Sequence, residues 1–117
     1  MAKLIHLLED NLDIREILNL LLNENFDILS FPDVASFLEG LSKKNPDLFI
    51  LDVMLPDGNG IEVCSKLRAD PKTSKIPIVM MSANYTSTQM SKLCKADDFI
   101  SKPFDITEFS DRVAILV

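Results

Sequence analysis

The sequence predicts an α/β domain in which one parallel sheet of five strands is covered by helices. Short apolar runs alternate along the chain with segments whose apolar residues recur at the spacing of one helix face. The run at residues 48–51 is apolar throughout, as expected of a strand with both faces covered. The chain has 117 residues, of which 47% are hydrophobic and 26% charged, so it fits one domain with a single core.

The first half of the chain is expected to hold three strands and two helices. The strands are predicted at residues 3–8, 26–30 and 48–51. Between the first two, apolar residues occupy the i, i+3, i+4 and i+7 positions of a helix: Ile14, Ile17, Leu18 and Leu21. Asp33 is the expected N-cap of the second helix. The predicted inward face of that helix is Val34, Phe37, Leu38 and Leu41.

The second half continues the alternation. A loop rich in turn formers is expected at residues 54–60, and a short helix follows at 61–67. The fourth and fifth strands are predicted at 78–81 and 98–101. The polar stretch at 84–95 is expected to hold the fourth helix, although its apolar face is thin.

A last helix is predicted after Asp105, which forms a capping-box pattern with Glu108. The residues expected to face inward are Ile106, Phe109 and Val113. The chain therefore reads as one domain over residues 1–117, either complete or part of a longer protein.

Carboxylates follow two of the predicted strands. Asp52 comes directly after the run at 48–51, and Glu9 with Asp10 follows the first strand. The carboxyl ends of parallel strands meet at one edge of a sheet, so these side chains are expected to lie together. Oxygen ligands favour Mg²⁺, with Mn²⁺ as an alternative. An acidic pair after a strand also commonly caps the next helix, and this alternative stays open for Glu9 and Asp10.

Two further polar residues are expected at the same edge. Lys102 precedes Pro103, which favours extended backbone at the lysine and lets its ammonium point toward a phosphoryl oxygen. Ser82 follows the fourth strand, and its hydroxyl can donate a hydrogen bond. A solvated lysine or a capping serine would explain each residue alone. Together with the three acids, they predict a site for a divalent cation and a phosphoryl group.

Composition argues against several other classes. The net charge of −6 argues against direct nucleic-acid binding. No apolar run approaches the roughly 18 residues of a membrane span, so no membrane insertion and a cytoplasmic location are expected. Cys64 and Cys94 are far apart, without a CxxC motif, and are interpreted as buried, reduced structural thiols rather than a zinc site. His6 is expected to be a packed core or edge residue of the first strand.

Four segments resemble the receiver domains of two-component response regulators, chemotaxis-regulator-like ones included, over nearly the whole chain. They are residues 8–11, 51–60, 81–83 and 96–104. The resemblance implies a flavodoxin-like, doubly wound sheet in the strand order 2-1-3-4-5. With five helices this makes a three-layer sandwich.

The resemblance also implies a chemistry. Asp52 would be the phosphoacceptor, taking a phosphoryl group from a histidine kinase or a phosphotransfer protein. The groups implied to hold Mg²⁺ are Glu9, Asp10, Asp52 and the backbone carbonyl of Met54. The domain would be a phospho-switch that assists its own phosphorylation and dephosphorylation, not an enzyme with its own small-molecule substrate.

Other implied roles concern the response to phosphorylation. Lys102 would pair with the phosphoryl oxygens, Ser82 would move to hydrogen-bond them, and Phe99 would change rotamer. Met54 and Asn84 occupy positions that tune the lifetime of the phosphoryl group. The face made by the fourth helix, fifth strand and fifth helix would signal to an unknown output protein or to an effector domain outside this sequence.

Some features depart from the family pattern. Glu9 stands where Asp is commoner, and Ser82 replaces the frequent Thr. The segment at 82–102 is short, so a short fourth helix is expected. The sequence leaves three alternatives. One is a haloacid-dehalogenase-type hydrolase, although the second acid of its DxD pattern is missing from Asp52-Val53-Met54. The others are a pseudo-receiver that binds without phosphorylation and a flavodoxin-like cofactor binder.

Overall fold

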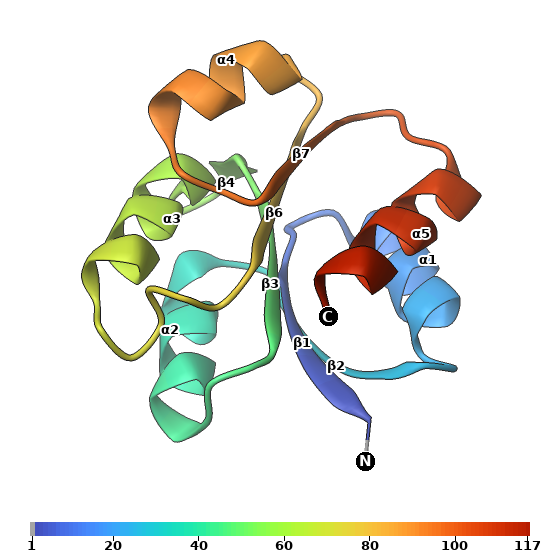
Figure 1. Cartoon of the computed structure of the whole chain (residues 1–117), viewed down its shortest axis with the longest axis horizontal. Coiled ribbons are helices and arrows are strands. Elements are labelled where there is room, and N and C mark those ends of the chain that lie inside the picture. The colour runs from blue at the N-terminus through green and yellow to red at the C-terminus, as the bar shows by residue number, and fades with distance from the viewer. Residues whose placement is uncertain (1) are drawn as a thin grey trace.

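Five parallel strands form the central sheet in the spatial order β2-β1-β3-β6-β7 (Figure 1). The computed structural model describes residues 2–117. The strands are β1 (Lys3–Leu8), β2 (Phe26–Phe31), β3 (Leu48–Asp52), β6 (Ile78–Ser82) and β7 (Asp98–Ser101). Counted along the chain as five strands, this order is 2-1-3-4-5, which confirms the predicted topology.

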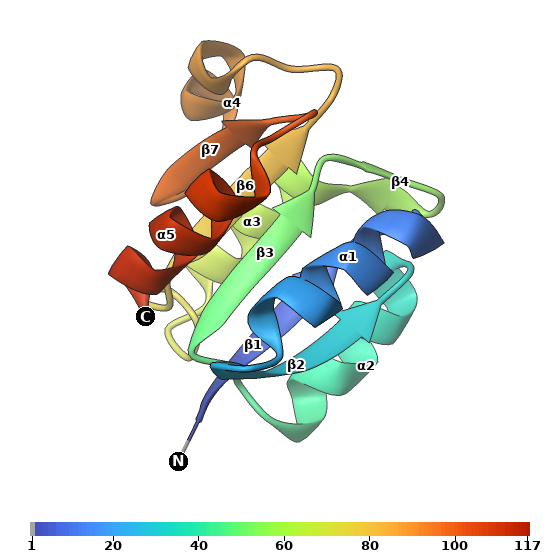
Figure 2. The same cartoon turned by 90° about the vertical axis from the view of Figure 1, so that its right-hand side faces the viewer.

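Helices cover both faces of the sheet (Figures 1 and 2). They are α1 (Leu12–Leu22), α2 (Val34–Lys43), α3 (Gly60–Ala69), α4 (Ser87–Leu93) and α5 (Ile106–Leu116). Helices α1 and α5 lie on one face, and α2, α3 and α4 lie on the other. Across residues 2–117, every helix is too short or too polar to cross a membrane.

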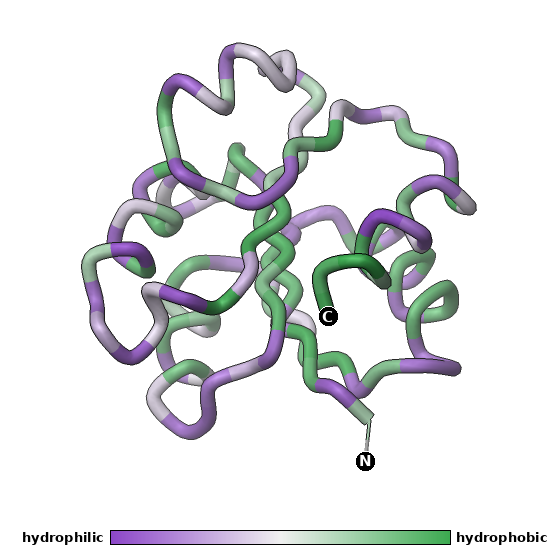
Figure 3. Tube along the Cα trace, viewed as in Figure 1, coloured by the Kyte–Doolittle hydropathy of each residue, from purple (hydrophilic) through white to green (hydrophobic). Residues whose placement is uncertain are grey.

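Alternating side chains of the strands divide the core into two clusters. In β3, Phe49 and Leu51 pack beneath α2, α3 and α4, whereas Leu48 and Ile50 pack beneath α1 and α5. All four are fully buried, because helices cover both faces of the sheet. Figure 3 shows hydrophobic residues concentrated along the central strands, and many hydrophilic residues in the helices and loops around them.

The structure adds a small hairpin that the sequence did not predict. Strands β4 (Met54–Leu55) and β5 (Gly58–Asn59) pair antiparallel within the predicted loop at 54–60. Strands of two residues carry no readable alternation, so only the turn formers were visible in the sequence. The hairpin lies directly after Asp52 and leads straight into α3.

The N-terminus of α2 is held from two sides. Asp33 accepts a hydrogen bond from the backbone N–H of Ser36 at 2.8 Å, as predicted for its N-cap. From the hairpin, Asp57 accepts from the backbone N–H groups of Val34 and Ala35 at 2.8 and 3.0 Å. The two carboxylates satisfy backbone donors that the first turn of a helix leaves free. The hairpin and α2 are thereby fastened together.

Helix α4 is short, with seven residues, as the sequence led us to expect. Its start is nevertheless well defined, because Thr86 and Gln89 form a reciprocal capping box. At α5, Asp105 accepts from the backbone N–H of Glu108 at 2.9 Å. The carboxylate of Glu108 lies 3.5 Å from Arg112, so the capping box predicted there is only half formed.

His6 is fully buried within β1. Its ring meets those of Phe31, Phe37 and Phe49 edge-on, with centroid distances of 5.3, 6.3 and 6.1 Å. Within residues 2–117, neither ring nitrogen has a hydrogen-bond partner. Burial lowers the pKa of His6 to about 4, because the charged ring would lose its hydration without a compensating partner. The expectation that His6 packs in the core is confirmed.

His6 predicts a pH-dependent stability. Its pKa in the folded chain lies below the unfolded value of 6.5, so its contribution is complete above that value and is lost as the pH falls toward about 4. As the pH falls from about 7 to about 5, the wild type should lose about 2 kcal/mol of unfolding free energy that His6→Leu does not lose. Urea unfolding at both pH values measures this difference.

Phe49→Leu is the matched control, since it alters the same aromatic cluster without a titratable group. Its difference in unfolding free energy from the wild type should stay constant over this pH range. If the difference for His6→Leu stays constant as well, the buried ring is not disfavoured in its charged form.

Candidate functional site

Three carboxylates meet at the carboxyl edge of the sheet. Glu9 and Asp10 follow β1, and Asp52 is the last residue of the neighbouring strand β3. One oxygen from each side chain lies within 4.8 Å of the other two. The grouping expected from the sequence is therefore present, and it comes from the parallel register that pairs Leu8 with Leu51.

The acids occupy unequal environments. Glu9 is fully buried and Asp52 is 5% exposed, whereas Asp10 faces solvent. Burial raises the pKa of Glu9 and the nearby Asp52 carboxylate raises it further, while Lys102 opposes both effects. The pKa of Asp10 is also raised, by desolvation and then by Glu9. The cluster is short of positive charge, and all its donors are the hard oxygens that Mg²⁺ prefers.

Lys102 supplies the local positive charge. Its ammonium is paired with the Glu9 carboxylate and lies 3.3 Å from Oδ2 of Asp52. The position of the Lys102 backbone is fixed by its N–H, which donates to the carbonyl of Ser82 at 2.9 Å. A cis peptide bond joins Lys102 to Pro103. The ammonium thus lies between a buried carboxylate and the strand-end aspartate.

The backbone around Asp52 leaves one of its carboxylate oxygens facing Lys102. Oδ1 accepts from the backbone N–H of Val53 at 2.9 Å, and Oδ2 is the oxygen nearest Lys102. The start of α3 packs against the same strand end, where Gly60 donates to the carbonyl of Val53 at 2.8 Å. A Cβ at Gly60 would stand 1.9 Å from the carbonyl oxygen of Asp52, so only glycine permits this approach.

Ser82 joins the site from β6. It is fully buried, and its Oγ accepts from the backbone N–H groups of Asn84 and Tyr85 at 3.0 and 3.3 Å. The hydroxyl therefore anchors the turn between β6 and α4, while its own proton stays available for an acceptor. Asn84 is exposed beyond it.

The remaining predicted residues lie on either side of this centre. Met54 is 52% exposed at the start of the hairpin, two positions after Asp52. Phe99 lies in β7 and packs, half-buried, against the cluster beneath α2, α3 and α4. Tyr85 packs against that same cluster.

Two residues that sequence reasoning missed shape the turn after β1. Arg15 donates from Nη1 to the carbonyls of Glu9 and Asp10, at 2.8 and 3.0 Å. Asn11, not either acid, caps α1 by accepting from the backbone N–H of Ile14 at 3.0 Å. This removes the capping alternative for Glu9 and Asp10. A polar residue at the predicted helix start was the available signal.

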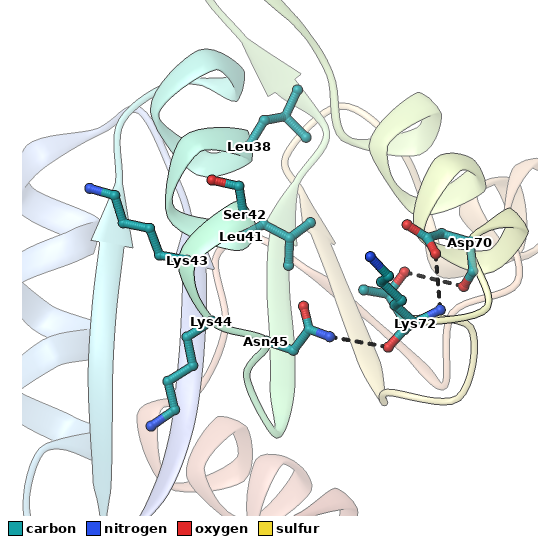
Figure 4. Close-up of a pocket in the computed structure, with 9 residues that line it drawn as sticks. Leu38, Leu41, Ser42, Lys43, Lys44, Asn45, Asp70 and Lys72 are labelled. Atoms are coloured by element: carbon teal, nitrogen blue, oxygen red, sulfur yellow. Dashed lines mark hydrogen bonds between the residues drawn. The ribbon is translucent and has the colours of Figure 1, made fainter.

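The groove shown in Figure 4 is separate from this site. It lies between the carboxyl ends of α2 and α3, at the opposite edge of the sheet from Asp52. Asn45 donates to the carbonyl of Lys72 across it at 3.3 Å. The side chains of Lys43 and Lys44 point away from Asp70 and Lys72, so the lysines do not converge on one point of the groove.

Comparison with known proteins places this site in a family. Residues 5–114 match the response regulator receiver domain. The chain belongs to this family. The receiver domain is 38% identical, over 116 residues, to the DNA-binding response regulator MtrA of Mycolicibacterium paratuberculosis, a match that covers 97% of this chain and 50% of that protein. The chain spans about half the length of the curated relatives that it matches first.

Solved structures agree with the fold. The receiver domain of a signal transduction histidine kinase from Syntrophus aciditrophicus superposes with a TM-score of 0.90 at 29% identity, covering 98% of this chain and 89% of that chain. The receiver domain of the sensor histidine kinase PA1611 from Pseudomonas aeruginosa PAO1 superposes with a TM-score of 0.87 at 19% identity, covering 99% and 98%. That structure holds a magnesium ion in its active-site cleft.

The pairing of Lys102 with Glu9 predicts an energetic coupling. Lys102→Met leaves the buried carboxylates of Glu9 and Asp52 without their cation, whereas in a Glu9→Gln background only Asp52 loses it. Without added metal, we expect Lys102→Met to cost about 1–3 kcal/mol more in the wild type than in Glu9→Gln. Urea unfolding of the four proteins measures this difference.

Lys92→Met is the control for this cycle, because Lys92 is exposed on α4. Its effect should be small and the same in both backgrounds. An equal cost of Lys102→Met in both backgrounds would show that the ion pair contributes nothing to stability.

Proposed function

We propose that this receiver domain accepts a phosphoryl group on Asp52 from the phosphohistidine of a histidine kinase or phosphotransfer protein. The observation that carries the proposal is the position of Lys102, 3.3 Å from Oδ2 of Asp52. This pair lies within a group of three carboxylates whose oxygens approach within 4.8 Å of one another. A carboxylate oxygen beside one fixed cation and beside a set of metal-binding oxygens is arranged for phosphoryl transfer.

The residues present fit Mg²⁺, with Mn²⁺ as the alternative. Glu9, Asp10 and Asp52 offer hard oxygen donors, and we assign the backbone carbonyl of Met54 as the fourth protein ligand. Burial and mutual repulsion already raise the pKa of Glu9, which a bound cation would counteract. When bound, the ion supplies positive charge that stabilises the phosphoryl oxygens and orients them.

The protein's own groups then account for the transfer. Oδ2 of Asp52 attacks phosphorus, the P–N bond of the phosphohistidine breaks, and the imidazole leaves. Lys102 is fixed close to the oxygen that reacts, so its charge meets the phosphoryl oxygens without rearrangement of the strand. Beyond the nucleophile itself, the protein needs to supply only positioning and electrostatic stabilisation, because phosphoryl transfer depends mainly on these two.

The domain acts as a switch that assists its own phosphorylation and dephosphorylation, rather than as an enzyme with a separate substrate. Met54 and Asn84 are both exposed and follow Asp52 and Ser82 by two positions, so we assign to their side chains the control of how water approaches the acyl phosphate. A haloacid-dehalogenase-type hydrolase is a poorer fit, because Met54 stands where the second acid of that pattern would be.

Phosphorylation is coupled to the surface through Ser82. Its hydroxyl anchors Asn84 and Tyr85, so a phosphoryl group that draws Ser82 toward itself pulls on the turn that leads into α4. Tyr85 and Phe99 pack against one apolar cluster, and Ser87 of α4 donates to the carbonyl of Phe99 at 3.1 Å. A shift at Ser82 therefore reaches the surface formed by α4, β7 and α5.

That surface is the proposed output face. It would act on an output protein, or on an effector domain in a longer chain, rather than on nucleic acid or membrane directly. The net charge of −6 supports the exclusion of direct nucleic-acid binding. The proposed setting is the cytoplasm, where free thiols such as Cys64 and Cys94 are kept reduced.

Intact mass after incubation with acetyl phosphate and Mg²⁺ tests the proposal. We expect one added phosphoryl group on the wild type and none on Asp52→Asn, because the amide lacks the nucleophilic oxygen. Asp111→Asn, the same change at an exposed position of α5, should keep the adduct. A folded wild type that gains no mass would favour a pseudo-receiver that works by binding alone, and steady phosphate release from a phosphomonoester would favour the hydrolase.

Mg²⁺ is expected to raise the melting temperature. Binding to the folded state alone contributes about 2.7 kcal/mol at a hundredfold excess over the dissociation constant. The rise should be largely lost in Asp10→Asn and kept in Asp111→Asn, since only Asp10 belongs to the acidic group. A thermal titration without phosphodonor measures this, and a melting temperature unchanged by Mg²⁺ would exclude the metal site.

A further inference from the structure

Two cysteines that the proposed function does not use lie in the same buried cluster, one on α3 and one at the end of α4. Cys64 belongs to α3, and Cys94 caps the carboxyl end of α4. Both are buried members of the cluster beneath α2, α3 and α4, with exposed fractions of 0% and 7%. Their side chains interact, each altering the pKa of the other, although the residues lie far apart in the sequence. The Cys94 thiol itself donates to the carbonyl of Met90 at 3.6 Å.

The two thiols are not equivalent. Cys94 borders a surface groove between α3 and α4 whose cationic lining residues are Arg68, Lys92 and Lys95, whereas Cys64 has no exposed surface. The Cys64 thiol, the backbone N–H of Ala96 and the Arg68 guanidinium all favour a thiolate at Cys94. They lower the pKa of Cys94 to about 7, against the opposing effect of burial, while the pKa of Cys64 is raised. A thiol with this access and charge environment is the reactive one of a pair.

We propose that Cys64 and Cys94 form a reversible disulfide that fastens α4 to α3, with Cys94 reacting first with a hydroperoxide and Cys64 completing the bond. Reactive cysteines that sense oxidants are accessible, surrounded by positive charge and next to a resolving thiol. Cys94, although only 7% exposed, lines a surface groove beside Arg68, Lys92 and Lys95, and Cys64 is the resolving partner.

The chemistry balances with hydrogen peroxide as the oxidant. The Cys94 thiolate attacks one peroxide oxygen, the O–O bond breaks, and the departing hydroxide takes a proton to become water. The sulfenic acid left on Cys94 is attacked by the sulfur of Cys64, and the S–O bond breaks as the S–S bond forms. The hydroxyl leaves as water with the Cys64 proton. Two thiols are oxidised and one peroxide is reduced to two water molecules.

The bond would act on the part of the proposed output face that α4 forms. Helix α4 has seven residues and is joined to β7 by the Ser87 hydroxyl and side-chain packing. A covalent link from its last turn to α3 restricts how far α4 can move, whatever the state of Asp52. Formation of the disulfide itself does not depend on phosphorylation, so its test is independent of the proposed function.

The test uses the whole chain, which is first reduced and then treated with hydrogen peroxide. The protein is then unfolded in the presence of N-ethylmaleimide, and its intact mass is measured. We expect the wild type to lose the mass of two hydrogen atoms, take up no maleimide, remain monomeric, and return to two reactive thiols with dithiothreitol. Digestion should yield one cross-linked pair of peptides, containing Cys64 and Cys94. Two maleimides on the treated wild type, or disulfides only between chains, would overturn the proposal.

Single variants assign the order of reaction. Cys64→Ala should accumulate a sulfenic acid on Cys94 that dimedone traps, and Cys94→Ala should leave Cys64 free to take one maleimide. The opposite pattern would overturn the assigned order. Because the wild-type masses and peptides decide whether the bond forms, the proposal stays testable even if a variant fails to fold. Amide exchange in the last turn of α4 should slow on oxidation, and unchanged exchange would refute the fastening of α4.

Discussion

Repulsion among Glu9, Asp10 and Asp52 is the constraint on which the arrangement of this receiver domain depends. Three carboxylates within 4.8 Å of one another, one of them fully buried, are tolerated only beside positive charge. Lys102 supplies part of that charge from the far side of the sheet, and its position follows from the backbone bond between Lys102 and Ser82. One ammonium does not balance three acids. The remaining deficit of positive charge is what makes this edge of the sheet a candidate site for a cation.

The sheet itself was predictable because its strands are unusually easy to recognise. An apolar run closed by an acid, as at Leu51-Asp52, marks both a covered strand and the edge at which it ends. Parallel order then brings Asp52 beside Glu9 without any knowledge of their contacts. The receiver family, the topology and the grouping of the three acids were therefore accessible from the sequence. Some strand ends differed by one residue, since β2 continues to Phe31, β3 to Asp52 and β6 to Ser82.

What escaped prediction depends on contacts between elements rather than on patterns within them. Arg15 reads as a solvated helix residue until the fold places the Glu9 and Asp10 carbonyls within its reach. The half-formed capping box of α5 has the same origin, since Arg112 draws the Glu108 carboxylate away. Cys64 and Cys94 were predicted to be buried, and they are, but the packing of α3 against α4 that joins them leaves no trace in their spacing.

The strand order has a consequence for the protein as it is being made. Acidic residues at the ends of β1 and β3 come from the first half of the chain, while the cation that offsets them follows β7, the last strand and an outer one in the sheet. A nascent chain that has emerged only through β6 carries the acids without Lys102. A ribosome adds about 5–20 residues per second, so this charge-unbalanced intermediate persists for seconds. The charge at this edge of the sheet is therefore balanced only late in synthesis.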